Sequence, residues 1–554
     1  MVLAISELSG HDSGLIRFQM LQISQLRLAL DLGEDALKAA AARELRVPVH
    51  FIRSLKVKQR AIDARRGNAE FSCTVLVSVL EEEAILRRLA GNSRVVAAPD
   101  ETYVQLAALP ATQTVKARPV IVGTGPCGLF AGLLLARQGL RPILLERGKA
   151  AGDRARDVTG FWRRSWEFNP DSNVQFGEGG AGTFSDGKLY TQIRDREHRI
   201  PWVLQELVKA GAPEDILVNN RPHIGTDRLI KVVRTIREEI LSLGGEVRFD
   251  ARVTDVLIEN GAMRAVTLSS GETIESDRFI FATGHSSRDT FEMLLKRGIS
   301  FERKPFSVGV RIEHPQSLID RSQYGRFAGH PKLGAAAYRF VSHCSTGRSA
   351  YSFCMCPGGL VVASTSEPGM VVTNGMSSYA RAEANANSGF MVEVTEADFD
   401  GPGPLAGIEY QRNLERKAFE LGGSDYKAPA QLLGDYMRGK ASTGPGSVQP
   451  SYLPGVTWTD VSQILPDYVN ATLREAVQIL EKQIPGFGLD DAVVTGVETR
   501  SSSPVRIPRD PETCECLEVK QFYPAGEGAG YAGGIISAAV DGMRVAEQLL
   551  KRAD

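Results

Sequence analysis

One segment constrains the fold of this chain more than any other, PVIVGTGPCGLFAGLLLARQGLRPILLERG at residues 119–148. A short apolar run at 120–122 leads into a glycine-rich turn, and a longer apolar run then ends at Gly139. A second short apolar run at 143–145 ends at Glu146. Short apolar runs bounded by turn residues are typical of buried strands, and the longer run between them is typical of a buried helix. The segment therefore predicts a strand–turn–helix–strand unit of an α/β protein.

The glycines of this turn follow the spacing G-x-G-x-x-G. In such a turn, Gly123 allows the sharp change of direction, Gly125 leaves room for a pyrophosphate, and Gly128 lets the helix pack closely on the strand. The free amides of the helix that begins near Pro126 would face the phosphates. Glu146 lies where an acid hydrogen-bonds the adenosine ribose. The order of these parts predicts a dinucleotide site, and the alternative is an accidental glycine-rich turn.

The composition is that of an ordinary globular protein and argues against several classes. The chain has 554 residues, with 65 Lys and Arg against 66 Asp and Glu, and its length predicts about three domains. A net charge near zero argues against the whole molecule as an electrostatic partner of nucleic acid or acidic membrane. Seven cysteines in so long a chain do not form a disulfide framework, which favours a cytoplasmic setting. We expect no membrane span, because the most apolar window, residues 129–136, is far too short.

The amino-terminal part reads as a separate small module. Residues 1–19 leave two interpretations open, a disordered leader or a misplaced start. Residues 20–105 alternate strand-like and helix-like segments, which predicts a ferredoxin-like α/β module. Within it, residues 43–66 carry eight Lys or Arg and two acids, which indicates either a solvated basic face or a docking surface for RNA or an acidic partner. Residues 106–118 lack periodicity and are predicted to be a linker.

The glycine motif alone does not distinguish FAD from NAD, and two later segments decide between them. FIFATG, residues 279–284, is an apolar strand that ends in Ala-Thr-Gly. FYPAGEGAGYAGGIISAAVDGMRVAEQLL, residues 522–550, places Gly526 and Glu527 after a strand and before a long helix. The three segments in this order resemble flavoproteins of the glutathione-reductase and p-hydroxybenzoate-hydroxylase superfamily. The resemblance implies that the chain binds FAD.

The same resemblance implies the domain organisation and the fold class, α/β. It predicts a Rossmann-like FAD-binding domain that is discontinuous in sequence, with a first part at 119–306 and a C-terminal part at 506–554. Residues 307–505 would form a mixed α+β substrate or cover domain. The spacing G-x-G-x-x-G recurs at 177–182 and 528–533, but both lie within the predicted FAD-binding domain, and neither opens a separate nicotinamide domain. NAD(P)H as a transient electron donor would therefore have to bind in the cover domain.

By this resemblance, Glu527 hydrogen-bonds the ribityl chain of FAD. The helix after Gly533 and Gly534 would point its amino end at the flavin pyrimidine edge, where it stabilises the negative charge of reduced flavin. The residues predicted to bind the cofactor are Gly123, Gly125, Pro126, Cys127, Gly128, Glu146, Arg147, Gly177, Gly179, Gly180, Gly182, Thr183, Val253, Thr283, Gly284, Gly526, Glu527, Gly533, Gly534 and Ile535.

A second glycine-rich stretch, FGEGGAGTFSDGKL, occupies residues 176–189. Such a loop can offer consecutive backbone amides to a phosphate or to the flavin ring. The alternative is a flexible surface loop, but Phe176, Phe184 and Leu189 would anchor the stretch, and pure linkers lack such residues. We therefore predict that this loop also contacts the cofactor.

A narrower resemblance rests on seven segments spread over most of the chain. They are FGEGGAGTFSDGKL (176–189), RPHIGTDRL (221–229), ATGHSSRDT (282–290), FSVGVRIEHP (306–315), FCMCPGG (353–359), NGMS (374–377) and GEGAGYAGGI (526–535). Together they resemble a group of bacterial and plastid proteins called uncharacterised FAD-dependent, or NAD/FAD-utilising, dehydrogenases. This resemblance implies an FAD-dependent oxidoreductase and no particular substrate.

The candidate catalytic residues are Cys354 and Cys356 of the predicted cover domain. Two thiols beside a flavin could exchange electrons with it through a disulfide or a thiolate–flavin adduct. However, the preceding AYSFCMC looks like a strand, and C-x-C on a strand points its side chains to opposite faces, which favours a structural role. Neither this pair nor Cys514 and Cys516 has zinc-ligand spacing, so we predict no metal. Arg500 and Arg506 are candidates, one of which could bind an anionic substrate or the flavin phosphate, with a surface salt bridge as the alternative.

These observations leave three hypotheses for function. The leading one is a FAD-dependent oxidoreductase that transfers hydride or electrons between flavin and a small organic substrate. The second is an RNA-modifying flavoenzyme that grips RNA with the basic stretch at 43–66. The third is a non-catalytic flavin-binding scaffold whose amino-terminal module recruits a partner.

Overall fold

A computed structural model describes residues 20–105 and 117–551 of this chain. The chain divides into two compact units, one built from residues up to 63 and 69–100, the other from residues 64–68 and 101 onward. The interpretations of residues 1–19 and most of the predicted linker at 106–118 lie outside the described residues. Within those described ranges, no helix is both long enough and apolar enough to cross a bilayer.

The first unit is a four-stranded antiparallel sheet in the order β2-β3-β1-β4, with one helix after β1 and one after β3. Side chains of β3 alternate strictly between buried and half-buried, as expected of a strand with one covered face. This strand order and connectivity confirm the predicted ferredoxin-like module. Its elements are β1 (Leu21–Ala29), α1 (Glu34–Leu45), β2 (Ile52–Asp63), β3 (Glu70–Val79), α2 (Glu82–Arg88) and β4 (Val95–Ala97).

The sequence interpretation missed strand β2, which lies within the basic stretch at 43–66. As an edge strand, β2 leaves most of its side chains exposed or half-buried, including Lys56 and Arg60. Charged residues along an edge strand hinder pairing with other chains, and they also obscure the apolar alternation that marks a strand. The basic stretch is therefore the end of α1 followed by one sheet edge.

A five-stranded parallel sheet lies in the second unit, in the order β23-β11-β5-β6-β7. Strand β23 comes from near the end of the chain and pairs with β11, so the sheet is assembled from segments far apart in sequence. This arrangement confirms the Rossmann-like, discontinuous domain. Its strands are β5 (Val120–Val122), β6 (Ile143–Leu145), β7 (Glu246–Arg248), β11 (Phe279–Phe281) and β23 (Phe522–Pro524).

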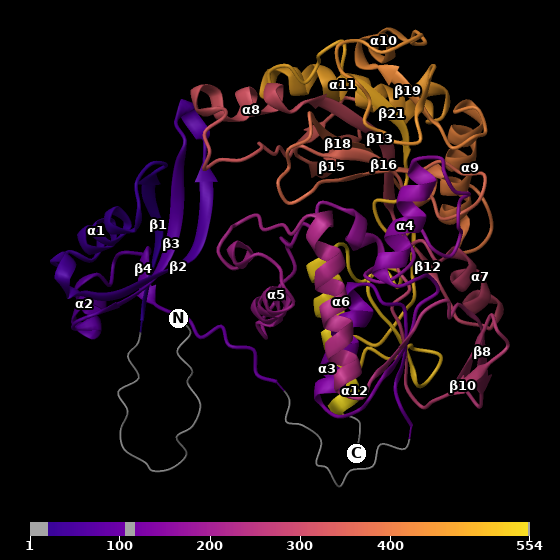
Figure 1. Ribbon diagram of the computed structural model, residues 1–554, viewed down its shortest axis with the longest axis horizontal. Coiled ribbons are helices and arrows are strands. Elements are labelled where there is room, and N and C mark those ends of the chain that lie inside the picture. Colours follow the sequence, from indigo (N-terminus) through magenta and orange to yellow (C-terminus); the bar gives the residue numbers. More distant parts are fainter. Residues whose placement is uncertain (1–19, 106–116, 552–554) are drawn as a thin grey trace. The chain divides into compact units, whose positions relative to one another are not determined.

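Three helices lie side by side next to this sheet, α3 (Pro126–Arg137), α6 (Thr226–Ser242) and α12 (Ile535–Lys551) (Figure 1). Helix α3 is apolar nearly all round because both of its sides are covered. A side chain at Gly542 of α12 would lie 2.1 Å from the carbonyl oxygen of Cys127, so this glycine permits the close crossing of α12 and α3. The other elements of this part are α4 (Ala151–Trp162), α5 (Arg199–Lys209), α7 (Arg288–Lys296), and the antiparallel strands β8 (Val253–Glu259), β9 (Ala262–Leu268) and β10 (Thr273–Glu275).

A mixed seven-stranded sheet forms the core of the region after residue 305, in the order β14-β15-β18-β13-β21-β19-β20. On its central strand β13, Val308, Val310 and Ile312 enter an apolar core shared with α11, whereas Arg311 and Glu313 are buried polar side chains. One face of the strand is therefore apolar and the other polar. The strands of this sheet are β13 (Phe306–Pro315), β14 (Val341–His343), β15 (Ser349–Cys356), β18 (Asn385–Val394), β19 (Ala428–Leu432), β20 (Val456–Trp458) and β21 (Val493–Glu498).

Helices and short strands surround this sheet, and the region is mixed α+β as predicted. The helices are α8 (Gln316–Tyr324), α9 (Ala406–Leu421), α10 (Leu433–Arg438) and α11 (Asp467–Gln483). The short strand pairs are β12 (Glu302–Arg303) with β22 (Val505–Arg506), and β16 (Leu360–Ala363) with β17 (Thr373–Met376).

Candidate functional site

The glycine turn between β5 and α3 contains two glycines that the packing of the chain itself requires. Gly123 has φ +102°, and a Cβ there would lie 2.4 Å from the carbonyl oxygen of Ala282. A Cβ on Gly128 would lie 1.9 Å from the carbonyl oxygen of Gly123. Real Cβ contacts are never that short, so these two positions exclude any larger residue.

Two other predicted cofactor residues, Gly125 and Gly533, are glycines that the fold does not need. Gly125 caps α3 with φ −67°, and the atom nearest to a Cβ there would be the Cα of Gly180 at 3.8 Å. Gly533 has no positive φ, and no described atom lies within 4 Å of its would-be Cβ. Gly284 and Gly534 also face open space, although positive φ values explain why they are glycine. At none of these four positions would a Cβ come within 4 Å of a described side chain.

The second glycine loop packs against the first. The backbone N–H of Gly179 donates to the carbonyl oxygen of Thr124 at 2.9 Å. A Cβ on Gly180 would lie 3.0 Å from the Cα of Gly125, so the two loops approach backbone to backbone. A Cβ on Gly182 would lie 3.2 Å from the side chain of Ile535, at the start of α12. The structure therefore brings three separate predicted segments to one place.

A fully buried arginine holds the second loop in shape. The Arg154 guanidinium of α4 donates to the carbonyl oxygens of Asn173, Val174, Gly177 and Glu178, at 2.7–3.1 Å. Burial lowers the pKa of Arg154 to about 10, with the nearby carboxylates acting in the opposite direction. Because the Arg154 guanidinium binds four backbone carbonyl oxygens, it fixes the backbone of residues 173–178. Sequence reasoning missed Arg154, because only the folded chain brings α4 beside residues 173–178.

Glu146, at the end of β6, joins both glycine loops. One carboxylate oxygen accepts the N–H groups of Gly148 and Gly177 at 3.0 and 2.9 Å. The other accepts the N–H and the hydroxyl of Thr124 at 2.9 and 2.7 Å. A carboxylate can accept about four hydrogen bonds. Groups of the chain itself already donate four to Glu146. Its contact with the adenosine ribose stays a prediction, and its observed role is to fix the loops.

Other predicted cofactor residues have well-defined surroundings. The Arg147 guanidinium lies 4.2 Å from the ring centre of Phe176 and pairs with Asp289 at 2.9 Å. The Cys127 side chain is buried against Gly526, and burial raises the pKa of its thiol. Val253 begins β8, and its side chain is buried in an apolar cluster. Thr183 is buried at the end of the second glycine loop, and its hydroxyl donates to the carbonyl oxygen of Glu178.

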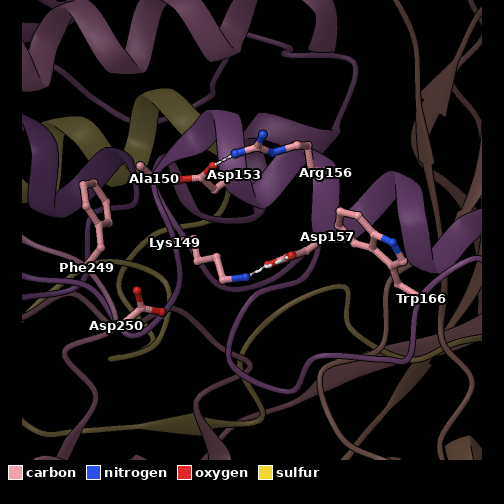
Figure 2. A pocket seen from close by; sticks show the side chains of 8 residues that line it. All are labelled: Lys149, Ala150, Asp153, Arg156, Asp157, Trp166, Phe249 and Asp250. Atoms are coloured by element: carbon pink, nitrogen blue, oxygen red, sulfur yellow. Dashed lines mark hydrogen bonds and ion pairs between the residues drawn. The ribbon is translucent and has the colours of Figure 1, made fainter.

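A hollow of about 500 Å³ opens beyond the carboxyl ends of β6 and β7 (Figure 2). Its wall carries two ion pairs, Lys149 with Asp157 at 3.0 Å and Asp153 with Arg156. Ligands of open parallel sheets bind at this end of the strands. Sequence reasoning did not select these residues, because they come from separate segments. The lining residues are Lys149, Ala150, Asp153, Arg156, Asp157, Trp166, Phe249 and Asp250.

Glu527 is half-buried in the glycine-rich stretch before α12. Burial raises the pKa of its carboxyl to about 7, although Lys304 and the N–H of Gly534 favour the charged form. Burial lowers the pKa of His285 to about 3, and the neighbouring Arg500 and Arg288 add to this effect. Near neutral pH, Glu527 is therefore close to half-protonated and His285 is neutral.

Arg500 is engaged within the protein. Its guanidinium donates to the carboxylate of Glu415 at 3.1 and 2.9 Å and also to Ser286 and Ser366. Arg288 binds the same carboxylate at 2.7 and 2.9 Å. These cations hold the pKa of Glu415 below its usual range despite burial. Arg500 therefore forms a salt bridge, but a buried one and not the surface pair that was the predicted alternative.

All seven cysteines are free thiols. Cys354 is exposed, whereas Cys356 is buried, and its sulfur lies 3.5 Å from Arg311 Nη2 and 3.8 Å from Lys188 Nζ. Cys514 and Cys516 are buried. Within residues 20–105 and 117–551, no group of three or more His, Cys, Asp and Glu side chains is placed to hold a metal ion.

Three family descriptions match separate parts of the chain. An FAD binding domain matches residues 116–159, and a family described as "FAD-dependent protein, C-terminal domain-like" matches residues 305–501. A domain of unknown function matches residues 20–78. The match at 116–159 covers the first glycine turn and Glu146, and it supports FAD as the cofactor.

Relatives and solved structures extend the comparison. A 15-cis-phytoene desaturase from Capsicum annuum is 33% identical over 123 residues, 21% of this chain and 19% of that protein. Quinol fumarate reductase FrdA from E. coli is 15% identical, covers 79% of this chain and 70% of its own, and has a TM-score of 0.35. The halogenase PltM, solved in complex with FAD, is 12% identical with the same coverages and a TM-score of 0.35.

A full-length relative settles the family. An uncharacterized protein from Clostridium beijerinckii is 45% identical over 540 residues, 96% of this chain and 99% of that protein. Together with the FAD-binding match, this identity over nearly the whole length shows that the chain belongs to the same family as the Clostridium beijerinckii protein, within the flavoprotein oxidoreductase superfamily.

Proposed function

We propose that this protein is a FAD-dependent oxidoreductase, a dehydrogenase that moves hydride or electrons between flavin and a small organic substrate. The observation that carries the proposal is the pair Gly125 and Gly533, two glycines that neither packing nor backbone angle requires. Gly125 directly precedes α3, with only the Cα of Gly180 near its would-be Cβ at 3.8 Å, and Gly533 lies two residues before α12 with nothing within 4 Å. A bound group that needs bare backbone and helix amino ends explains both positions.

The proposal assigns the cofactor to the residues that the fold gathers there. The pyrophosphate would lie at the amino end of α3, between the turn at 123–128 and the loop at 177–183. The flavin would lie between Thr283 and Gly284 after β11 and the start of α12 at 533–535, with Glu527 nearby. When bound, FAD supplies the hydride and electron chemistry, and the chain binds and orients it.

The rest of the second unit would provide the substrate side. In this proposal, residues 119–306 and 506–554 bind FAD, and residues 307–505 cover it and shape the substrate pocket. The buried polar face of β13, with Arg311 and Glu313, supports a polar wall on the cover side. NAD(P)H is one candidate electron donor in this pocket, and a reduced, cytoplasmic setting fits the free thiols.

Cofactor binding is tested with Gly125→Val and the matched control Gly152→Val. Gly152 lies in α4, outside the turn at 123–128 and the loop at 177–183, and no described atom is within 4 Å of a Cβ there, so its substitution adds the same side chain away from the proposed pyrophosphate contacts. Purified wild type and Gly152→Val should retain or take up about one FAD per chain. Gly125→Val should fold with the same circular dichroism and lose FAD. Wild-type protein that stays colourless after FAD is added would overturn the proposal.

Catalysis is tested separately from binding. The flavin is photoreduced without oxygen and then mixed in a stopped-flow instrument with candidate acceptors, including NAD(P)⁺, enones and quinones. One acceptor that reoxidises the flavin much faster than the others would identify the substrate class. Equally slow reoxidation by every acceptor would indicate a flavin-binding scaffold rather than an enzyme.

A further inference from the structure

Strand β15 contains an irregularity at its two cysteines. Phe353 pairs with Gly389 of β18, and Cys356 pairs with Asn387. Between these two pairs, β15 therefore has one more residue than β18. Cys354 lies within the bulge with φ +41°. A bulge re-aims side chains and breaks the alternation of a regular strand. The regular alternation on which the expectation of opposite faces depends is therefore interrupted at these two cysteines.

The same two cations act on both cysteines. Lys188 Nζ and Arg311 Nη2 lie 3.8 and 3.5 Å from Cys356 Sγ, and Arg311 also donates to the carbonyl oxygen of Cys354 at 2.6 Å. Both cations lower the pKa of the Cys354 thiol, while burial raises it to about 12. The thiol of Cys356 donates to the carbonyl oxygen of Cys354 at 3.2 Å. The two thiols therefore share one electropositive environment.

These cations are held in place by the fold. Arg311 is fully buried and donates to Glu498 at 3.0 and 2.9 Å and to Asn387 at 2.9 Å. A Cβ on Gly375 would lie 1.9 Å from Arg311 Nη2, so this glycine makes room for the guanidinium. Residues of several strands therefore hold Arg311 in place, and its contact with Cys356 is not a chance surface contact.

Carboxylates fix the positions of these cations. Lys188 pairs with Asp186 at 3.1 Å, and Arg381 binds the same carboxylate. Arg311 pairs with Glu498, and its charge also acts on the neighbouring carboxyl of Glu313. The two cations beside Cys356 Sγ are therefore held by ion pairs as well as by hydrogen bonds.

We propose that Cys354 and Cys356 form a redox pair that alternates between a dithiol and a disulfide and exchanges electrons with a dithiol partner through the exposed Cys354. In the reducing direction, a thiolate of the partner attacks Cys354 Sγ. The Cys354–Cys356 bond breaks, and Cys356 leaves as a thiolate beside Lys188 and Arg311. The second thiol of the partner, as its thiolate, then attacks the partner's sulfur in the mixed disulfide and releases Cys354. The partner leaves as a disulfide, and the pair has gained two electrons and two protons.

The two cysteines differ in exposure and in the cations beside them, and this difference determines which sulfur the partner's thiolate attacks. Cys354 is the exposed residue of the pair, so an external thiolate approaches from its side. A leaving thiolate that is stabilised by neighbouring cations departs faster, so attack at Cys354 is favoured over attack at Cys356. This proposal goes beyond the proposed function, because the exchange involves only the thiols of the chain and an external dithiol.

The test uses the full chain, equilibrated without oxygen in mixtures of reduced and oxidised dithiothreitol. Acid quenching, unfolding and N-ethylmaleimide labelling then count the free thiols by intact mass. The seven cysteines should all be labelled at high reductant, and two labels should disappear together at low reductant. Peptide mapping should place the lost labels on Cys354 and Cys356. Seven labels at every ratio would overturn the proposal.

Variants make the assignment specific. Cys354→Ser and Cys356→Ser should each abolish the loss of two labels at low reductant. Cys344→Ser should leave that loss unchanged and carry six labels at high reductant. Lys188→Met should slow the reduction of the disulfide by dithiothreitol by roughly tenfold, because a charge that stabilises the leaving thiolate is removed. A rate of reduction that Lys188→Met does not change would contradict the role of the cations. FAD content, measured on the same samples, separates these outcomes from a failure of the cofactor proposal.

Discussion

The carboxylate of Asp541, on helix α12, accepts the backbone N–H of Gly526 at 2.7 Å. The same carboxylate pairs with Arg509, and both side chains are nearly inaccessible to solvent. One residue of α12 thus anchors the start of the glycine-rich stretch that leads into that helix. The orientation of the amino end of α12 depends on this contact.

Replacing Asp541 with Asn should reduce the free energy of unfolding by about 3 kcal/mol, because the buried Arg509 loses its counter-charge. Urea unfolding followed by circular dichroism measures the change. Asp255→Asn is the control, since Asp255 pairs with Arg297 at the surface and its loss should cost less than about 1 kcal/mol. Equal effects of the two substitutions would show that burial does not distinguish the pairs.

Two glycines of helix α3 should respond very differently to alanine. A Cβ on Gly128 meets the backbone of Gly123 at 1.9 Å, which cannot move without breaking the turn. A Cβ on Gly132 meets the methyl groups of Leu144 at 3.0 and 3.1 Å, and these can shift. Gly128→Ala should therefore lower the melting temperature strongly and Gly132→Ala only slightly, as differential scanning fluorimetry can measure. Similar melting temperatures would contradict the packing described at Gly128.

Changing Glu146 to Gln should destabilise the protein although the shape of the side chain is kept. Both oxygens of Glu146 accept hydrogen bonds from N–H groups, so an amide NH₂ must face a donor whichever way it turns. We expect a loss of about 1–3 kcal/mol in the free energy of unfolding, the cost of an unsatisfied buried donor. Glu146→Ala should cost more, because it leaves several N–H groups without acceptors. A Gln variant as stable as wild type would argue against the observed bonding.

Glu527 should make the stability of the FAD-free protein depend on pH. Burial raises the pKa of its carboxyl from 4.5 to about 7 in the folded state. Between these values the folded state binds more protons than the unfolded state, so the stability contributed by protonated Glu527 is lost as pH rises from 4.5 to 7. Glu527→Gln should remove this loss and be more stable than wild type above pH 7, by about 1–2 kcal/mol for a half-buried group. Parallel curves of stability against pH for both proteins would refute this.

The parts of the fold that sequence reasoning predicted are those where local pattern and spacing decide the structure. The short apolar runs and the glycine spacing at 123–128 predicted the strand–turn–helix unit that the structure has. The segments at 279–284 and 522–550 supplied the strands β11 and β23 of the same sheet. In each case a few neighbouring residues are enough to predict the local structure.

The parts that it missed depend on contacts between distant segments. Strand β2 was missed because its exposed edge carries charges instead of an apolar alternation. The bulge at Cys354 and Cys356 was also missed, because it depends on the register between β15 and β18. Arg154 and the hollow lined by Lys149 and Phe249 were missed, because no local pattern indicates which distant loops a side chain will reach.

The edge strand β23 has a consequence for biosynthesis. It pairs with β11, but a ribosome makes it only after the whole region between residues 282 and 521 has been synthesised. A nascent chain must therefore keep the open edge of β11 from pairing elsewhere while an intervening domain folds. Completion of the parallel sheet by β23 is thus one of the last events in the maturation of this protein.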